Sequence, residues 1–139
     1  MLDWLFGRPT KTQVIEMLSK GNIGYLSATC CNPAAATADT QLIANLDKAM
    51  ENLGQKREVY KETLTSAQGA LPAVAGSMND SQKQVIQKVM TLFSTQGLAA
   101  FPILFVDGDI VAYGGVPSVQ IIEDAIKTKL GASEAQVAN

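Results

Sequence analysis

Apolar residues recur at the spacing of an amphipathic helix in several segments of the chain. Segment 39–53 shows this pattern up to Gly54, and segment 12–20 shows it up to Gly21; both glycines are typical helix terminators. Segment 118–130 has early acidic residues, late lysines and Gly131 just beyond its end. We expect this last helix to turn the following residues inward: Ile121, Ile122, Ala125, Ile126 and Leu130.

A fourth helix is predicted over residues 81–96, where Ser81 and Gln84 have the spacing of a capping box. The segment before it, 65–79, is rich in small residues and contains Pro72. Proline and glycine interrupt regular structure, so we expect an irregular loop there.

Apolar runs without helical spacing predict strands. Residues 101–106 and 109–113 flank Asp107-Gly108, a pair that two-residue hairpin turns favour. Residues 23–28 are short and uncharged, as in a buried central strand, and residues 56–64 predict a second, less apolar strand.

The order of these elements predicts the fold class. A strand, helix and strand joined through a helix to a hairpin and a closing helix gives an α/β protein with a four-stranded mixed sheet, because parallel strands need helical crossovers. This β-α-β-α-β-β-α order, with an extra N-terminal helix, is the layout of a thioredoxin-like fold. We expect an N-terminal arm and helix over residues 1–21, the thioredoxin-like domain over 22–131, and a flexible tail over 132–139.

Composition excludes several functions. The net charge of −2 comes from scattered charges, which argues against nucleic-acid binding, and no apolar run is long enough for a membrane span. The start of the chain lacks the features of a signal peptide, so we expect a cytoplasmic location. The absence of histidine removes the commonest general base, which favours a non-enzymatic role.

The only two cysteines are adjacent, Cys30 and Cys31, directly after the predicted strand 23–28. A thiol between a strand end and a helix start meets the positive end of the helix dipole, which favours the thiolate. Adjacent Cα atoms are about 3.8 Å apart, below the roughly 4.4–6.8 Å usual for disulfides, so a Cys30–Cys31 bridge would be strained. Two adjacent thiolates suit a soft metal or metalloid instead.

Five further residues are expected to support this dithiol. Thr29, Asn32 and Pro33 flank it, with Thr29 as a hydrogen-bonding group and the other two shaping the entry into the helix. Phe101 and Pro102 precede the first hairpin strand, where thioredoxin-type folds carry a cis-proline facing the active cysteines. We therefore expect Phe101-Pro102 to be a cis peptide bond.

The sequence resembles the ArsD family of arsenical-resistance metallochaperones and trans-acting repressors. The resemblance runs from about Tyr25 to Gly131 and is carried by Cys30-Cys31, by segment 97–108 and by segment 114–118. It implies a thioredoxin-like fold that binds trivalent arsenic or antimony through cysteines and delivers it to an efflux-pump ATPase. The family's third cysteine, five residues after the pair, falls on Ala36 here, so a three-thiolate site needs a ligand from outside this chain.

The leading hypothesis is therefore a cytoplasmic dithiol protein, without an obligatory cofactor, that binds As(III), Sb(III) or another thiophilic metal for delivery or regulation. The missing ligand would come from a homodimer, from a small thiol such as glutathione, or from a client such as the ATPase. Two alternatives stay open: a thioredoxin-like thiol-disulfide oxidoreductase, and a scaffold domain that has lost its site.

Overall fold

The computed structural model describes residues 8–29 and 32–131. The sheet has four strands in the order β2-β1-β3-β4: β2 is Val59–Thr63, β1 is Ile23–Ser27, β3 is Ile103–Val106 and β4 is Asp109–Ala112. β1 runs parallel to β2 and antiparallel to β3, and β3 is antiparallel to β4. The predicted mixed α/β class with a four-stranded mixed sheet is confirmed.

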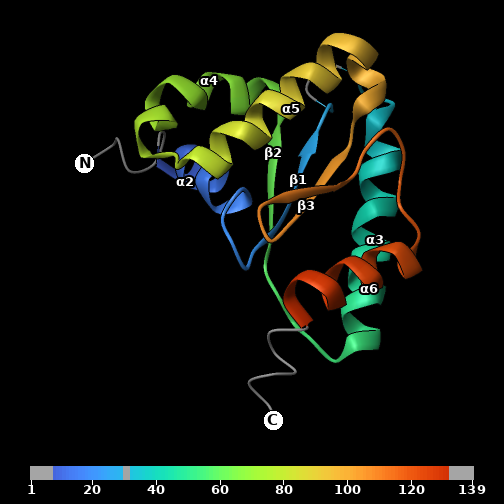
Figure 1. Cartoon of the computed structure of the whole chain (residues 1–139). Helices are drawn as coiled ribbons and strands as arrows, with labels where there is room; N and C mark the ends of the chain where they lie inside the picture. The colour runs from blue at the N-terminus through green and yellow to red at the C-terminus, as the bar shows by residue number, and fades with distance from the viewer. Residues whose placement is uncertain (1–7, 30–31, 132–139) are drawn as a thin grey trace.

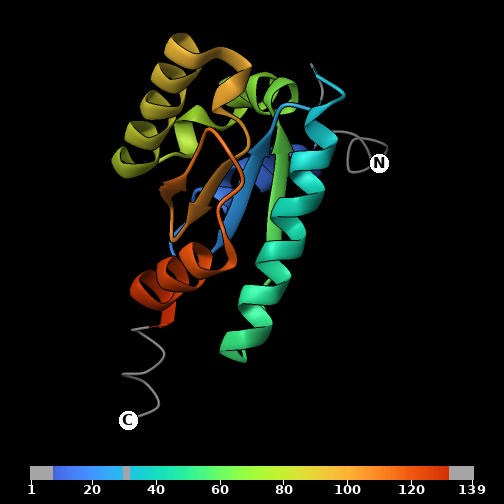
Figure 2. The ribbon, with the colours of Figure 1, turned by 90° about the vertical axis from the view of Figure 1, so that its right-hand side faces the viewer.

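Helices cover both faces of the sheet (Figures 1 and 2). Helices α3 (Ala35–Leu53) and α6 (Val119–Ile126) pack on one face, and the π-helical turn η3 (Lys127–Gly131) extends α6. Helices α2 (Arg8–Met17), α4 (Leu64–Val74) and α5 (Asp80–Gln96) pack on the other. Two short 3-10 turns, η1 (Ala75–Ser77) and η2 (Gly97–Ala100), precede and follow α5.

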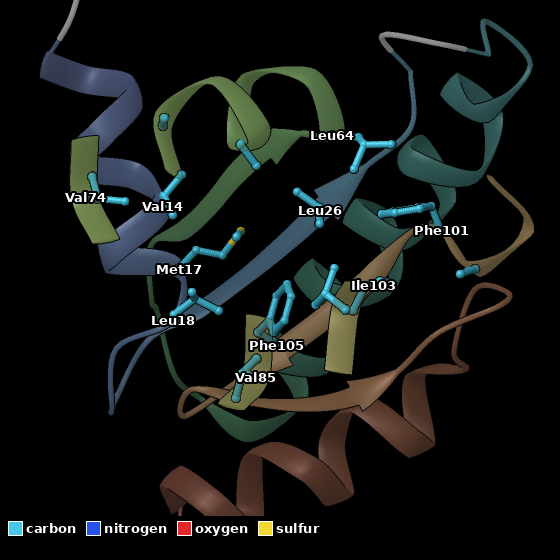
Figure 3. Packing of buried hydrophobic residues seen from close by; sticks show 14 of the residues in the cluster. Val14, Met17, Leu18, Leu26, Leu64, Val74, Val85, Phe101, Ile103 and Phe105 are labelled. Carbon is cyan, nitrogen blue, oxygen red and sulfur yellow. The ribbon is translucent and has the colours of Figure 1, made fainter. Parts of the chain in front are cut away.

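The alternation of side chains along β1 divides the core into two clusters. Leu26 packs with α2, α4 and α5, whereas Ile23 and Tyr25 pack with α3 and α6. Figure 3 shows the first cluster, in which Phe105 lies fully buried between Leu18, Val85 and Ile103. The central strands β1 and β3 are therefore buried on both faces, which confirms the prediction of a buried central strand within residues 23–28.

Helix α2 lies very close to the sheet. A Cβ atom added to Gly24 of β1 would stand 2.5 Å from Cγ and 3.1 Å from Cα of Met17. The hairpin turn contacts the connection between α2 and β1: Asp107 Oδ1 accepts a hydrogen bond from the Gly21 N–H at 2.7 Å, and the Asp107 N–H donates to the Asn22 carbonyl at 2.8 Å. The N-terminal helix is thus built into the core.

Helix α4 occupies part of the segment that the sequence analysis predicted as a loop, so that prediction is wrong. Thr63 and Ser66 form a capping box, with the Ser66 N–H donating to Thr63 Oγ1 at 3.2 Å. Leu64, Ala67, Ala70 and Val74 then supply a buried face. Burial of this face outweighs the cost of Pro72 inside the helix, because tertiary packing routinely overrides local propensity.

Two smaller expectations are also wrong. The capping box of α5 pairs Asn79 with Gln82, not Ser81 with Gln84: the Gln82 N–H donates to Asn79 Oδ1 at 2.8 Å. Ile121 of α6 is 51% exposed, because the neighbouring Ile122 takes the buried position.

Candidate functional site

Cys30 and Cys31 lie outside the described residues, but both ends of the segment that holds them are described. Ala28 is buried just after β1, Thr29 is half-buried, and Asn32 and Pro33 are exposed before α3. The Asn32 N–H donates to the Ala28 carbonyl at 2.9 Å, and Asn32 Oδ1 accepts from the Ala34 N–H at 3.2 Å. Asn32 therefore shapes the entry into α3, as the sequence predicted.

The N–H groups at the start of α3 are bonded by the residues just before it. The Asn32 and Pro33 carbonyls accept from the Ala35 and Ala36 N–H groups at 2.9 and 3.1 Å, and Asn32 Oδ1 accepts from the Ala34 N–H. Ala34 stands at the N-cap position, where it offers no side-chain acceptor to the first-turn N–H groups. Helix N-termini usually have serine, threonine, aspartate or asparagine there. The dipole of this 19-residue helix still gives its first turn a partial positive charge that stabilises an anion nearby.

Phe101 and Pro102 lie at the same end of the sheet as Ser27 and Thr29. In the antiparallel register Leu26 pairs with Ile103, so the residue before Ile103 lies beside the residue after Leu26. The Phe101-Pro102 peptide bond is cis, as predicted. Phe101 itself points into the core, where its ring meets Phe93 edge-on at a centroid distance of 6.0 Å.

A buried carboxylate that sequence analysis missed lies beside this strand end. Asp39 of α3 is 6% exposed, and its Oδ2 accepts a hydrogen bond from Ser27 Oγ at 2.5 Å. Ser27 Oγ in turn accepts from the Thr29 N–H at 3.1 Å. Asp39 Oδ1 is buried and has no hydrogen-bond partner among the described residues. Thr29 is therefore part of a polar network that reaches α3.

Position along α3 could have indicated Asp39. It lies three residues before Leu42 and seven before Leu46, both fully buried, so it shares their helical face. An acidic residue near a helix start is more often a solvent-exposed charge that interacts with the helix dipole, so the residue type alone does not indicate burial.

Lys61 and Tyr25 complete the surroundings of Asp39. Lys61 Nζ lies 4.0 Å from Asp39 Oδ2 and 5.9 Å from the centre of the Tyr25 ring. These three residues line a cavity of about 280 Å³ with Thr40 and Ile43. Burial, and secondarily the charge of Asp39, raises the pKa of Tyr25 to about 12.

Ionisation of Tyr25 at high pH is expected to lower the free energy of unfolding. Its pKa is raised from 10.0 to about 12, so the folded state resists ionisation. The stability it contributes is complete below pH 10 and falls by about 2–3 kcal/mol as pH rises through 12. The pKa of Tyr60 is also raised, by burial and by nearby Glu58 and Glu16, so Tyr25→Phe should remove only the part of the tyrosinate absorbance that titrates near pH 12. Asp39→Asn should lower the pKa while burial keeps it above 10.0; an unchanged titration in Asp39→Asn would contradict the assigned charge effect.

A second buried carboxylate, Glu62 of β2, lies against α2 and α4. Its Oε1 accepts from Ser66 Oγ at 2.7 Å. The Gln13 amide, in the orientation that satisfies its hydrogen bonds, donates to Oε2 at 3.1 Å. Burial raises the pKa of Glu62 above 4.5, and the bond from Ser66 opposes this.

We expect Glu62→Gln to stabilise the protein at neutral pH. A raised folded-state pKa means that this group's contribution is complete below pH 4.5 and is lost as pH rises through the folded pKa. Urea unfolding at acidic and neutral pH should show the gain for Glu62→Gln at neutral pH only. The exposed control Asp47→Asn should leave the free energy of unfolding unchanged at both pH values. If the two variants behaved alike, Glu62 would not be a buried carboxyl with a raised pKa.

The described residues contain no group of three or more cysteine, histidine, aspartate or glutamate side chains close enough to hold a metal ion. Within the same described ranges, no helix has the length and apolar character needed to cross a bilayer. Neither finding bears on Cys30 or Cys31.

Together these features define a mixed α/β protein with a polar, partly buried site at the carboxyl end of its central strand. Comparison with protein-family models, with curated proteins and with solved structures finds no match to this chain.

Proposed function

We propose that the chain has a thioredoxin-like fold. The strand order β2-β1-β3-β4 supports this assignment, with β1 and β2 parallel, β3 antiparallel to β1, and β4 antiparallel to β3. Two further features support this assignment: helices lie on both faces of the sheet, and a cis-proline stands directly before β3. In such a fold the reactive cysteines follow β1.

We further propose that Cys30 and Cys31 bind trivalent arsenic, antimony or another thiophilic metal, in a cytoplasmic protein similar to the ArsD metallochaperones. The observation that carries this proposal is the position of the pair between a buried central strand and the start of the long helix α3. The first turn of α3 favours thiolate over thiol, and thiolate is the ligand that soft metals and metalloids prefer.

A third ligand has to come from outside the dithiol. The chain has no other cysteine and no histidine. A small thiol such as glutathione, a second copy of the chain or a client such as an efflux-pump ATPase would supply it. A metalloid held by two protein ligands and one exchangeable ligand suits delivery, because the exchangeable position is open to the recipient's thiolate.

A monosubstituted arsenical tests the dithiol without the third ligand. Phenylarsine oxide condenses with two thiols, forming two As–S bonds and releasing one water. We expect tight one-to-one binding by intact mass. Cys30→Ser and Cys31→Ser should each weaken binding by roughly 100-fold or more, because the second As–S bond is intramolecular.

The control is Asp39→Asn, which changes the neighbouring carboxylate and leaves both thiols. It should still bind one phenylarsine group. If the Cys30→Ser/Cys31→Ser double variant bound the arsenical as tightly as the unmodified protein, the dithiol proposal would be wrong. If the protein instead reduced disulfides with glutathione and bound no arsenical, the oxidoreductase alternative would replace it.

A further inference from the structure

A cavity of about 680 Å³ lies between helix α5 and the edge strand β4. Small-molecule sites in proteins commonly have volumes of about 300–1,000 Å³. Gln87, Lys88 and Leu92 line its helix side, and Ile110 and Tyr113 line its strand side. The cavity therefore has the size of a ligand site and a lining of both polar and apolar side chains.

Three of these side chains provide an apolar surface. Leu92 and Ile110 are partly buried and pack against the core cluster that contains Phe105. Tyr113 is 47% exposed, although it lines the cavity. Aromatic rings make favourable offset-stacked or edge-to-face contacts with one another. An aromatic ligand would therefore cover the exposed ring of Tyr113 together with the exposed parts of Leu92 and Ile110.

The polar groups of the lining are free to bind a ligand. Within the described ranges, the side chains of Gln87, Lys88 and Tyr113 make no hydrogen bond or ion pair with another residue. Asp109, which also lines the cavity, is paired with Lys129, whose Nζ lies 3.1 Å from its Oδ2. The ammonium group of Lys88 is therefore the uncompensated charge of this lining.

The surroundings of Lys88 favour an anion. A smaller cavity of about 110 Å³ shares Lys88 and Asp109 with the first one, and its lining adds Lys20 and no further carboxylate from the described residues. The whole chain carries a net charge of −2, so the charge here is opposite to that of the chain. Such local positive charge attracts a carboxylate.

The features of β4 favour a small molecule over a peptide strand as the occupant. β4 has only four residues, and its pairing with β3 has a register shift between Leu104 and Phe105. Short edge strands and bulges are features that prevent another chain from pairing with a sheet edge. Recognition at this cavity therefore depends on its side chains.

We propose that this α5–β4 cavity binds a small aromatic carboxylate. The carboxylate lies at the Lys88 ammonium, where the amide of Gln87 adds a hydrogen-bond donor, and the aromatic body contacts Tyr113, Leu92 and Ile110. Small-molecule sites usually combine an apolar lining with a few polar groups that fix the orientation of the ligand. None of these residues adjoins the cysteine segment in the sequence, and the site is independent of the proposed dithiol function.

Three probes of similar shape and different charge test this site: 2-naphthoate, the neutral 2-naphthamide and the cationic 2-naphthylmethylammonium. Binding to the full chain is followed by NMR. We expect naphthoate to shift the methyl signals of Leu92 and Ile110 in a saturable way, with a dissociation constant of about 1 mM or below. It should bind roughly threefold more tightly than the amide, and by a larger factor than the ammonium, because only the carboxylate is attracted to Lys88.

Two variants separate the charge from the aromatic contact. Lys88→Gln should weaken naphthoate binding by roughly threefold and change the affinity for naphthamide by less than about twofold. Tyr113→Ala should weaken the binding of both by roughly threefold or more, because it removes the ring contact. The matched control is Lys83→Gln, which makes the same change at an exposed position of α5 that lines neither cavity and should change either affinity by less than about twofold.

Two kinds of result would overturn the proposal. If naphthoate left the Leu92 and Ile110 signals unmoved, the cavity would not be its binding site. If the three probes bound equally well, or if Lys88→Gln and Lys83→Gln had equal effects on naphthoate, Lys88 would not recognise the carboxylate.

Discussion

Replacing Gly24 with valine is expected to cost more than about 3 kcal/mol of folding free energy and to leave little folded protein. The added Cβ would stand 2.5 Å from Met17 Cγ and 3.1 Å from Met17 Cα. A flexible side chain could rotate away, but the Cα belongs to the backbone of α2, so the whole helix would have to move off β1. Gly24→Ala introduces the same Cβ and should cost about 1–3 kcal/mol.

Gly69 provides the matched control. It lies within α4, and a Cβ added there meets nothing within 4 Å. Gly69→Ala should raise stability by roughly 0.5–1 kcal/mol, since alanine favours a helix interior. Urea unfolding followed by circular dichroism measures all three variants. Equal stabilities for Gly24→Ala and Gly69→Ala would show that α2 does not contact β1 as closely as described.

Phe105→Ala is expected to cost about 3–5 kcal/mol, the range for removing a buried aromatic side chain. Phe105 is 0% exposed on β3, and its ring fills the space between the sheet and helices α2 and α5. Its loss would leave a cavity that the surrounding strands cannot close.

Ile121→Ala is the control for this second prediction. Ile121 is 51% exposed, so its truncation should cost less than about 1 kcal/mol. The comparison also tests which isoleucine of α6 faces the core. If Ile121→Ala lowered the free energy of unfolding as much as Phe105→Ala does, Ile121 would face the core and the assigned orientation of α6 would be wrong.

Local sequence chemistry predicted the hairpin because a single feature determines it. Asp107 and Gly108 both have positive φ, 59° and 80°, which is the requirement of a type I′ turn. The strands on either side are short and mostly apolar, so their pattern does not also fit a helix. The helices 39–53 and 81–96 were recognised for a similar reason, since their spacing and terminal glycines agree.

The features that the sequence analysis did not predict depend on contacts between residues distant in the sequence. Helix α4 is stabilised by packing against α2, a partner that the small residues between 65 and 74 do not reveal. Asp39 is buried because Ser27, twelve residues earlier, donates a hydrogen bond to it. A cavity lined by Gln87, Asp109 and Lys129 likewise combines residues of α5, β4 and η3, which no local motif brings together.

The candidate dithiol itself was found from the sequence by the confinement of both cysteines to one position. The structure adds the residues on both sides of the pair: Thr29, which lies in a hydrogen-bond network with Ser27 and Asp39, and Asn32, which shapes the start of α3. The most direct test is native-state alkylation of Cys30 and Cys31, read by intact mass, with and without stoichiometric trivalent arsenic and glutathione. We predict rapid labelling of both thiols that arsenic prevents. Rapid labelling that arsenic does not prevent, or no labelling until the protein unfolds, would contradict the proposed function.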